Sequence, residues 1–478
     1  MTTKNTLSRK HFLQGAALVS AGSLLAACGQ PAAPTAAPTG AEKSTEAPKP
    51  TAVPTKQEPI ELKYSTADRE VENKVKAYDV ENFNAAMESS GKPYRIIDVK
   101  GPATDNDEHT KFTLDAAAGT LPDIFGTHGA WVADFAAAGY LADLGPYLTK
   151  WDGWSQIYDV LKPLATFEGK LVGVPSGGSF SFYYRKDVLQ NAGISLDQPK
   201  VWDDFYKVCD QIKTKTDSKV KPCGIPAATP WGGGTWGEGF IMVWLSFDGT
   251  IFDEADGKWV VSSPNLLNAF KVYETLAKNG WLTVDELLGT NPWEPIKYQE
   301  FPKGECAIVT GGDWQWTFDW GPEGATPIEG LFEKVERWAF PAENGKPFTF
   351  IDGTAGTVVA ANSKSIEGCV EFLEFINDPK HGCGSIEIHI GGPSNRRDFA
   401  DKCPAYKEIV NGKMYQASQF FETGRTYKFM RSGAEKLSEG VGRATEDIIT
   451  LDATAEEAME KFANDMIEAL GADKAKKA

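Results

Sequence analysis

The chain has 478 residues, of which 24% are charged, and its formal net charge at pH 7 is −17. This negative charge disfavours binding to nucleic acid and to anionic lipid surfaces. A chain of this length exceeds what one hydrophobic core supports, so we expect two lobes or domains.

The N-terminus predicts export from the cytoplasm. Basic residues within positions 4–10 precede an apolar stretch at 12–25 that is too short for a stable membrane-spanning helix. The sequence Leu-Ala-Ala-Cys that ends at Cys28 resembles the bacterial lipobox. This resemblance implies a signal peptide at 1–27 and a lipid on the Cys28 sulfur. Residues 8–14 also resemble a twin-arginine motif with Lys10 in place of the second arginine, which leaves the export route open.

A tether is predicted at residues 28–58. This segment consists almost entirely of Ala, Pro, Thr, Lys, Glu and Gly, and Val53 is its one larger aliphatic residue. Such a composition cannot bury a core, so we expect disorder, extended by proline. The segment would hold a folded body away from its lipid anchor.

The body that follows alternates strands and helices. Its first part predicts the order strand, helix, strand, helix, strand, at residues 60–64, 71–78, 94–99, 112–118 and 121–125. This order is typical of an α/β fold with a mostly parallel sheet covered by helices. Apolar spacing and capping residues predict later helices around 205–212, 264–280, 369–376 and 454–470.

Six cysteines follow Cys28, and an even number in an exported chain favours disulfides. Two pairs are close in sequence, Cys209 with Cys223 and Cys369 with Cys383, and each would join a predicted helix to the loop after it. Cys306 and Cys403 then remain as the third pair. Spacing alone does not fix the connectivity, because six cysteines allow about fifteen pairings.

Enzyme signatures are mostly missing from the sequence. The pattern Gly232-x-Gly234-x-x-Gly237 matches a dinucleotide fingerprint, but no apolar strand precedes it. We therefore expect no cofactor. A pair of carboxylates for glycoside hydrolysis remains an alternative, because the chain has 66 acidic residues and no single pair stands out.

Adjacent tyrosines at Tyr183 and Tyr184 raise a second alternative, a ferric iron site. Neighbouring residues on a strand point to opposite faces, so a shared metal would require a bend. No cluster of further ligands accompanies the pair in the sequence, and we expect no bound metal.

Tryptophan is the most suggestive residue type, with fourteen in the chain. An indole in a loop offers a flat apolar face on which a sugar ring can stack, while carboxylates accept hydrogen bonds from the hydroxyls. Asp313 and Asp352, each beside a glycine, supply such acceptors. The tryptophans in or next to Gly-rich loops are Trp131, Trp231, Trp236, Trp314 and Trp316.

Several segments together resemble extracellular solute-binding proteins of family 1, the sugar-binding group that supplies ABC importers. The resemblance runs in family order over roughly residues 60–470. The segments that carry it are Trp131–Leu141, Phe182–Leu189 with Ala192–Ile194 and Pro199–Phe205, Phe301–Ala307 with Gly311–Trp314, and Val358–Lys364 with Phe372–Ile376.

This resemblance implies a two-lobed periplasmic-binding-protein fold of the class II type. The chain would cross the hinge three times, near 178–184, 340–355 and 395–405. Lobe 1 would then comprise 59–180 and 341–400, and lobe 2 would comprise 181–340 and 401–478.

Ligand would bind in the cleft between the lobes. Carried over by motif, Trp314 would stack on the sugar, and the segment from Asp352 to Gly356 departs from the commoner hinge sequence of the family. The full set of expected ligand-binding residues is Asp68, Arg69, His128, Trp131, Trp231, Trp236, Asp313, Trp314, Asp352 and Arg397.

The sequence therefore predicts a lipid-anchored binding protein without enzymatic activity, on the outer face of the cell membrane. We expect a monomer that captures a sugar or polyol and delivers it to ABC permease subunits. It would contact the membrane through its lipid alone and would not bind nucleic acid. A surface-anchored glycoside hydrolase and a ferric-iron-binding protein are the alternatives.

Overall fold

The computed structural model describes residues 58–102, 105–127, 131–427 and 430–478. The predicted signal peptide, Cys28, nearly all of the tether and His128 lie outside these residues. Within the described residues, the main sheet has nine strands in the order β2-β1-β3-β12-β6-β10-β7, with β11 beside β6 and β13 beside β12. These strands are β1 Ile60–Thr66, β2 Tyr94–Lys100, β3 Ile124–Gly126, β6 Gly173–Arg185, β7 Lys221–Gly224, β10 Cys306–Gly311, β11 Val335–Trp338, β12 Phe350–Val359 and β13 Arg425–Thr426.

Helices flank this sheet. The longer ones are α1 Glu70–Ser90, α2 Asp105–Ala118, α6 Trp202–Lys215, α8 Pro264–Lys278, α13 Ile366–Ile376, α14 Pro379–Ile388, α17 Ala434–Ile449 and α18 Ala455–Leu470. The shorter ones are α3 Val132–Ala137, α4 Gly145–Leu148, α5 Lys186–Asn191, α7 Ile241–Leu245, α9 Val284–Leu287, α10 Trp293–Pro295, α11 Phe301–Lys303, α12 Leu331–Lys334, α15 Phe399–Lys402 and α16 Lys413–Gln419. Short strands β4 Thr166–Phe167 and β5 Lys170–Leu171 pair together, and β8 Phe252–Asp253, β9 Lys258–Ser262 and β14 Ala475–Lys477 form a small separate sheet.

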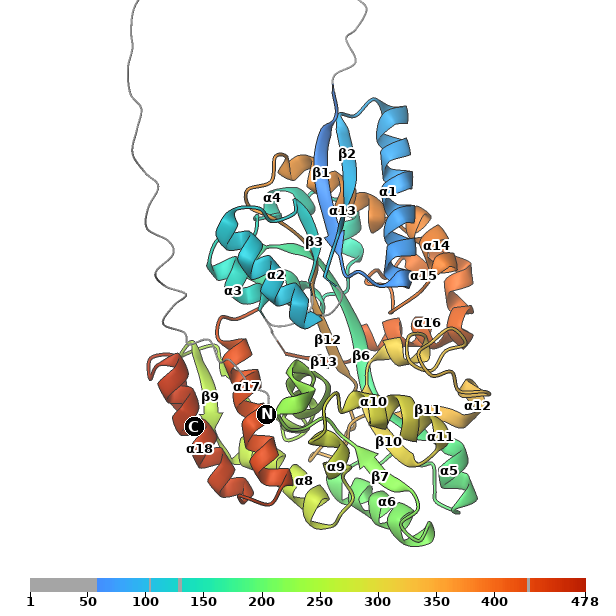
Figure 1. Ribbon diagram of the computed structural model, residues 1–478, viewed down its shortest axis with the longest axis vertical. Helices are drawn as coiled ribbons and strands as arrows, with labels where there is room; N and C mark the ends of the chain where they lie inside the picture. The colour runs from blue at the N-terminus through green and yellow to red at the C-terminus, as the bar shows by residue number, and fades with distance from the viewer. Residues whose placement is uncertain (1–57, 103–104, 128–130, 428–429) are drawn as a thin grey trace, which may run out of the picture. The chain divides into compact units, whose positions relative to one another are not determined.

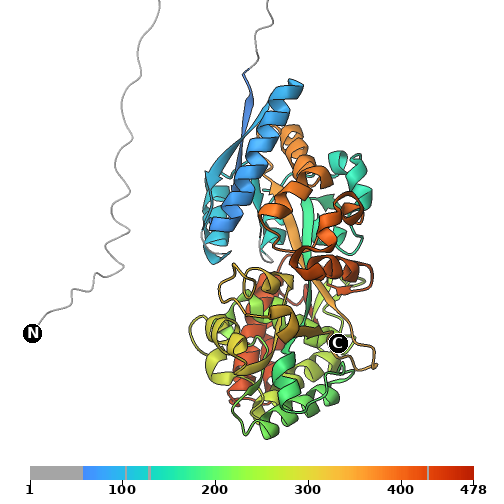
Figure 2. The ribbon, with the colours of Figure 1, turned by 90° about the vertical axis from the view of Figure 1, so that its right-hand side faces the viewer.

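Two strands pass from one half of the sheet to the other (Figures 1 and 2). In one half, which we call lobe 1, β1 pairs in parallel with β2 and β3. In the other half, lobe 2, β10 pairs with β7 and with the C-terminal end of β6. The strands β6 and β12 pair antiparallel with each other between these halves. This arrangement confirms the predicted two-lobed α/β fold.

Separate hydrophobic clusters support the division into lobes. One cluster contains Leu62, Phe83 and Phe372 from lobe 1, and another contains Phe182 and Trp244 from lobe 2. Neighbouring residues on β12 divide between the clusters, because Phe350 packs in the lobe 2 cluster and Ile351 in the lobe 1 cluster. Each lobe thus buries its own apolar side chains, and the connecting strands carry the chain between two cores.

Local sequence signals account for several helix ends. The Ser263 hydroxyl accepts a hydrogen bond from the Leu266 N–H, and Pro264 is the first residue of α8. Thr454 forms a capping box with Glu457 at the start of α18. Both predicted helix starts are confirmed. Among the described residues, no helix has the length and hydropathy needed to cross a bilayer.

The tyrosine pair belongs to the core of lobe 2 and does not converge on one point. The Tyr183 hydroxyl donates to the Gly312 carbonyl at 2.8 Å. Tyr184 stacks on Trp338 with ring centroids 3.9 Å apart. Burial raises the pKa of both hydroxyls, which opposes the deprotonation that iron binding needs.

The cysteine pairing differs from the prediction. The disulfide of the described residues joins Cys383 of α14 to Cys403, just after α15. The predicted pairs were wrong, because tertiary packing rather than closeness in sequence brings α14 to this segment. The remaining described cysteines are buried thiols, namely Cys209, Cys223, Cys306 and Cys369.

The cysteine pairing can be tested by counting thiols in residues 58–478 unfolded without reductant. We expect four reactive thiols per chain, from the free cysteines of the structure. The Cys383→Ser variant should additionally release Cys403. A wild-type chain without reactive thiols would support three disulfides and contradict this pairing.

Candidate functional site

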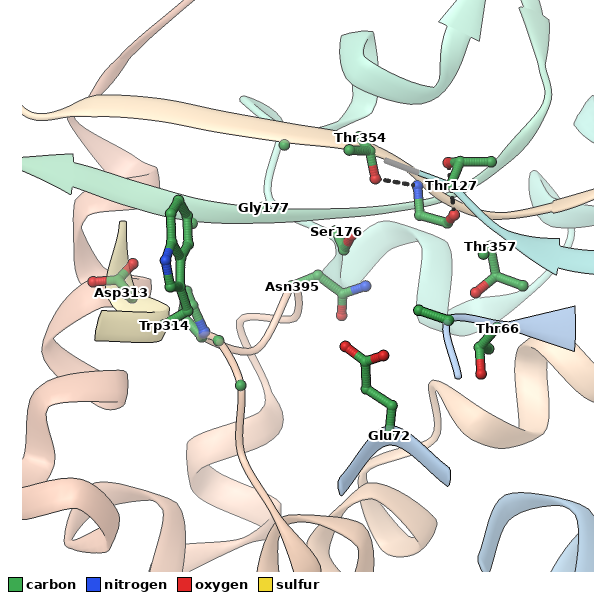
Figure 3. Close-up of a pocket in the computed structure, with 18 of the residues that line it drawn as sticks. Thr66, Glu72, Thr127, Ser176, Gly177, Asp313, Trp314, Thr354, Thr357 and Asn395 are labelled. Carbon is green, nitrogen blue, oxygen red and sulfur yellow. Dashed lines mark hydrogen bonds between the residues drawn. The ribbon is translucent and has the colours of Figure 1, made fainter. Parts of the chain in front are cut away.

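A cleft of about 740 Å³ lies where β6 and β12 pass between the lobes. Its walls come from both lobes and from the crossing strands. Lobe 1 contributes Thr66 and Glu72, and lobe 2 contributes Glu238 and Trp314. Figure 3 shows the Glu72 carboxylate pointing toward the Asn395 side chain, with the Trp314 ring beside β6. The volume is within the range of cavities that hold small organic ligands.

Glycine makes the floor of the cleft, where the crossing strands approach most closely. A Cβ on Gly353 would lie 2.1 Å from the Ser176 carbonyl oxygen, and a Cβ on Gly177 would lie 2.8 Å from that of Asp352. Side chains at these positions would force the strands apart. Glycine at these positions therefore permits the close backbone contact between β6 and β12.

Trp314 supplies the aromatic wall. It belongs to the short 3-10 helix η7, Asp313–Trp316, and its ring meets Phe180 edge to face with centroids 5.2 Å apart. A Cβ on Gly312 would lie 2.0 Å from the indole, so glycine there permits this ring position. The partly buried indole lines the cleft and offers it an apolar face.

Asp313 connects η7 to the hinge. Its carboxylate accepts hydrogen bonds from the Ser179 backbone N–H and hydroxyl, and it pairs with Arg337 at 2.7 Å. The Asp313 side chain is 1% exposed, and burial raises its pKa even though Arg337 acts in the opposite direction. Asp313 thus fixes the turn that carries Trp314 to the crossing point of β6.

At the start of α1, charged side chains border the lobe 1 wall. Arg69 pairs with Glu72 at 2.9 Å, and Glu72 lines the cleft. Asp68 pairs with Lys100 at 2.8 Å and accepts a hydrogen bond from the Asn73 amide, and these bonds lower the pKa of Asp68. Asp68 and Arg69 therefore do not line the cleft themselves, and Arg69 is connected to it through its ion pair with Glu72.

Asp352 lies in the cleft on β12. One of its oxygens accepts a hydrogen bond of 2.6 Å from the Gly353 N–H. Burial, with a smaller contribution from the negative charge of Glu238, raises the pKa of Asp352 to about 7. Glu238 also lines the cleft, from the π-helical turn η5 Thr235–Phe240, and pairs with Lys297.

The other expected site residues lie away from the cleft surface. Trp131 stacks on His109 in lobe 1 with centroids 5.4 Å apart. Trp236 packs near Trp244 in the lobe 2 core. Trp231 is buried behind the cleft glycines, with the Lys297 ammonium 5.3 Å from its ring.

Arg397 bonds to acidic side chains outside the cleft. Its guanidinium pairs with Glu422 at 2.8 Å and with Asp159 at 3.1 Å. These bonds raise the Arg397 pKa and leave the side chain directed at surface carboxylates.

Several lining residues were not foreseen from the sequence. Three of them carry buried polar atoms without a hydrogen-bond partner among the described residues, namely Thr66 Oγ1, Glu72 Oε2 and His389 Nε2. Glu238 directly follows the glycine pattern at Gly232, Gly234 and Gly237 that was noted in the sequence. Other polar lining side chains, among them Thr127, Thr354, Thr357 and Asn395, have no local signal in the sequence.

Comparison with known proteins agrees with this architecture. The family described as bacterial extracellular solute-binding proteins matches residues 81–382. A binding protein of Brucella abortus is 27% identical over 43% of this chain and 46% of its own length, so the chain spans about half of this relative. The arabinooligosaccharide-binding protein of Bacillus subtilis is 24% identical over 66% of this chain and 68% of its own.

Among solved structures, the cyclic alpha-maltosyl-1,6-maltose binding protein of Arthrobacter globiformis superposes with a TM-score of 0.71. The match covers 86% of this chain and 99% of that protein at 18% identity. At this identity the likeness shows the two-lobed fold alone.

Replacing Asp313 should reveal its role in the hinge. Asp313→Asn leaves Arg337 buried without its counter-charge, which we expect to lower the free energy of unfolding by about 3–5 kcal/mol. Urea unfolding at pH 7 measures this change. The control is Asp401→Asn, at an exposed pair with Lys407, which should change it by less than about 1 kcal/mol. Equal effects of the two variants would contradict the assignment.

Stability should depend on pH through Asp352. Its folded pKa of about 7 exceeds the ordinary value of 3.8, so the folded state favours the protonated form, and stability falls as pH rises between these values. Asp352→Asn, which stays neutral, should therefore have a higher Tm than wild type at pH 8. The difference should shrink toward pH 5. Thermal melts across this range would contradict the assignment if the difference were constant.

Proposed function

Because this chain belongs to the bacterial extracellular solute-binding proteins, we propose that it captures a saccharide or related polyol for an ABC importer. The observation that carries this proposal is the cleft between the lobes, where an indole face lies among carboxylate, hydroxyl and amide groups. A sugar presents the complementary surfaces, with C–H faces for the ring and hydroxyls for the polar groups.

The residues proposed to contact ligand come from both lobes and the hinge. Trp314 provides the stacking surface, and Asp352 and Glu238 accept hydrogen bonds from hydroxyls. Thr66 and Glu72 extend the contacts to lobe 1. A ligand that touches both walls binds the closed arrangement more tightly than an open one, and so shifts the population toward closure. A permease can then distinguish loaded from empty protein.

Binding without covalent chemistry fits the cleft better than hydrolysis. A glycoside hydrolase would need a pair of carboxylates, and Asp352 and Glu238 are two of the five that line this cleft. Glu238 is paired with Lys297 within the protein. The relatives named above are binding proteins, and saccharides appear in the names of two of them.

We further propose a location outside the cytoplasm. The export signal and the Cys28 lipobox support a lipid anchor, and residues 28–58 would connect it to the folded body. The protein would act as a monomer beside its permease.

The proposed function is tested by the intrinsic fluorescence and melting temperature of residues 58–478 with a panel of mono- and oligosaccharides, polyols and ferric ion. A saturable response to a saccharide that is recovered unchanged supports the proposal. Conversion of the saccharide to products favours the hydrolase, and a response to iron alone favours the iron-binding alternative.

Trp314→Ala should weaken binding of the responding saccharide about tenfold or more, because an aromatic contact contributes about 0.5–1.5 kcal/mol beyond its buried area. Isothermal titration calorimetry measures the loss. Trp154→Ala, at a partly exposed tryptophan outside the cleft, is the matched control and should leave the affinity unchanged. Equal affinities of wild type and Trp314→Ala would show that the indole does not contribute to ligand binding.

A further inference from the structure

The charges that line the cleft are almost all neutralised within the protein. Lys76, a lining cation, pairs with Asp98 at 2.7 Å and is thereby occupied. Three lining carboxylates have a cationic partner, in the pairs Glu72 with Arg69, Glu238 with Lys297 and Asp313 with Arg337, and a fourth, Asp79, is hydrogen-bonded to the His381 ring. The fifth carboxylate, Asp352, forms no ion pair among the described residues.

Asp352 is positioned to meet a ligand. One oxygen is occupied by the Gly353 N–H, and the other, Oδ2, lies 3.5 Å from where a Cβ of Gly237 would be. This second oxygen thus faces η5 of lobe 2 at Gly237, which has no side chain to cover it. Asp352 lies on the crossing strand β12 and lines the cleft.

Among the residues that the structure describes, the groups that face Asp352 supply no unpaired positive charge. From η5, Glu238 adds negative charge, and the ammonium of Lys297 is bonded to that carboxylate. From η7, the Asp313 carboxylate lies 3.5 Å from where a Cβ of Gly178 would be, and it is paired with Arg337. The surroundings of Asp352 therefore favour a cation brought from outside.

Closure of the lobes on a ligand would remove water from the Asp352 carboxylate and so raise the cost of its negative charge. A neutral saccharide can donate hydroxyl hydrogen bonds to Asp352 but brings no counter-charge, so burial under the closed lobes still favours the protonated carboxyl. A ligand with an ammonium group would instead form a charge-assisted hydrogen bond with the ionised form.

We propose that the preferred ligand is a saccharide with a protonated amino group, and that Asp352 is the residue that selects the amine. This inference rests on the proposed function and specifies its substrate class. The same charge distribution disfavours phosphorylated saccharides, because Lys76 is already paired with Asp98 and Lys297 with Glu238.

The test uses three matched series of probes with residues 58–478. These are β-1,4-linked glucosamine oligomers, the same oligomers with N-acetylated amines, and the corresponding glucose oligomers, together with galactosamine, N-acetylgalactosamine and galactose. Calorimetry at pH 5.5, low enough to protonate an amine whose basicity is reduced by neighbouring oxygens, gives affinity. Repetition in two buffers of different ionisation enthalpy gives the protons exchanged on binding.

We expect an amino saccharide to bind at least about tenfold more tightly than its acetylated and hydroxylated counterparts, as one charge-assisted bond predicts. Binding should release protons, because the amine favours ionised Asp352. Asp352→Asn should abolish the advantage and the proton release while retaining weak binding of the neutral counterparts. Asp285→Asn, an exposed carboxylate on α9, is the control and should behave as wild type.

The proton exchange in wild type needs no variant and remains informative if Asp352→Asn is unstable. Equal or tighter binding of the neutral saccharides, or proton uptake on amine binding, would overturn the amine selection and leave the proposed function intact. Failure of every saccharide, amino or neutral, to bind would overturn both.

Discussion

The antiparallel pairing of β6 with β12 is the constraint on which the rest of the structure depends. The register runs from Phe350 opposite Phe180 to Val358 opposite Gly173, with an irregularity between Thr354 and Thr357. At one end these strands belong to the lobe 1 core and at the other to the lobe 2 core. The same two strands therefore join the lobes and form the floor of the cleft. Residues that line the cleft thus belong to the segments that set how the lobes are connected.

Charge pairing stabilises this crossing, and in our proposal it also sets the ligand selectivity of the cleft. Asp313 and Arg337 place a buried ion pair against Ser179, where a partnered charge can hold η7 in one orientation. Asp352 lies on β12 and has no such partner among the residues that the structure describes. The two carboxylates therefore differ within one hinge, and a ligand-directed role of Asp352 is our proposal.

Much of the fold could be predicted because its signals are local. Alternating apolar runs, the Ser263-Pro264 start and the Thr454 capping box each act within a few residues. The disulfide could not be predicted in this way. Cys383 meets Cys403 because α14 and the segment after α15 pack together, and chain distance carries no information about that contact.

The candidate site was only partly accessible to sequence reasoning. Trp314 and Asp352 stand out as an indole and a carboxylate among glycines, and the structure places both in the cleft. Trp131 and Trp236 carry the same local signal but pack in the lobe cores, since a loop tryptophan satisfies a core as well as a cleft. Glu72 and Asn395 have no local signal, because they come from distant parts of the chain, α1 and the segment between α14 and α15. Which of these residues touch ligand stays a prediction.

The central claim is that the cleft retains a saccharide without changing it. Equilibrium dialysis of residues 58–478 against a mixed saccharide library, followed by mass spectrometry of what the protein retains, tests this claim most directly. The account predicts one saccharide class retained at one molecule per chain and recovered intact. Retention of no saccharide, or recovery of shortened products, would contradict it.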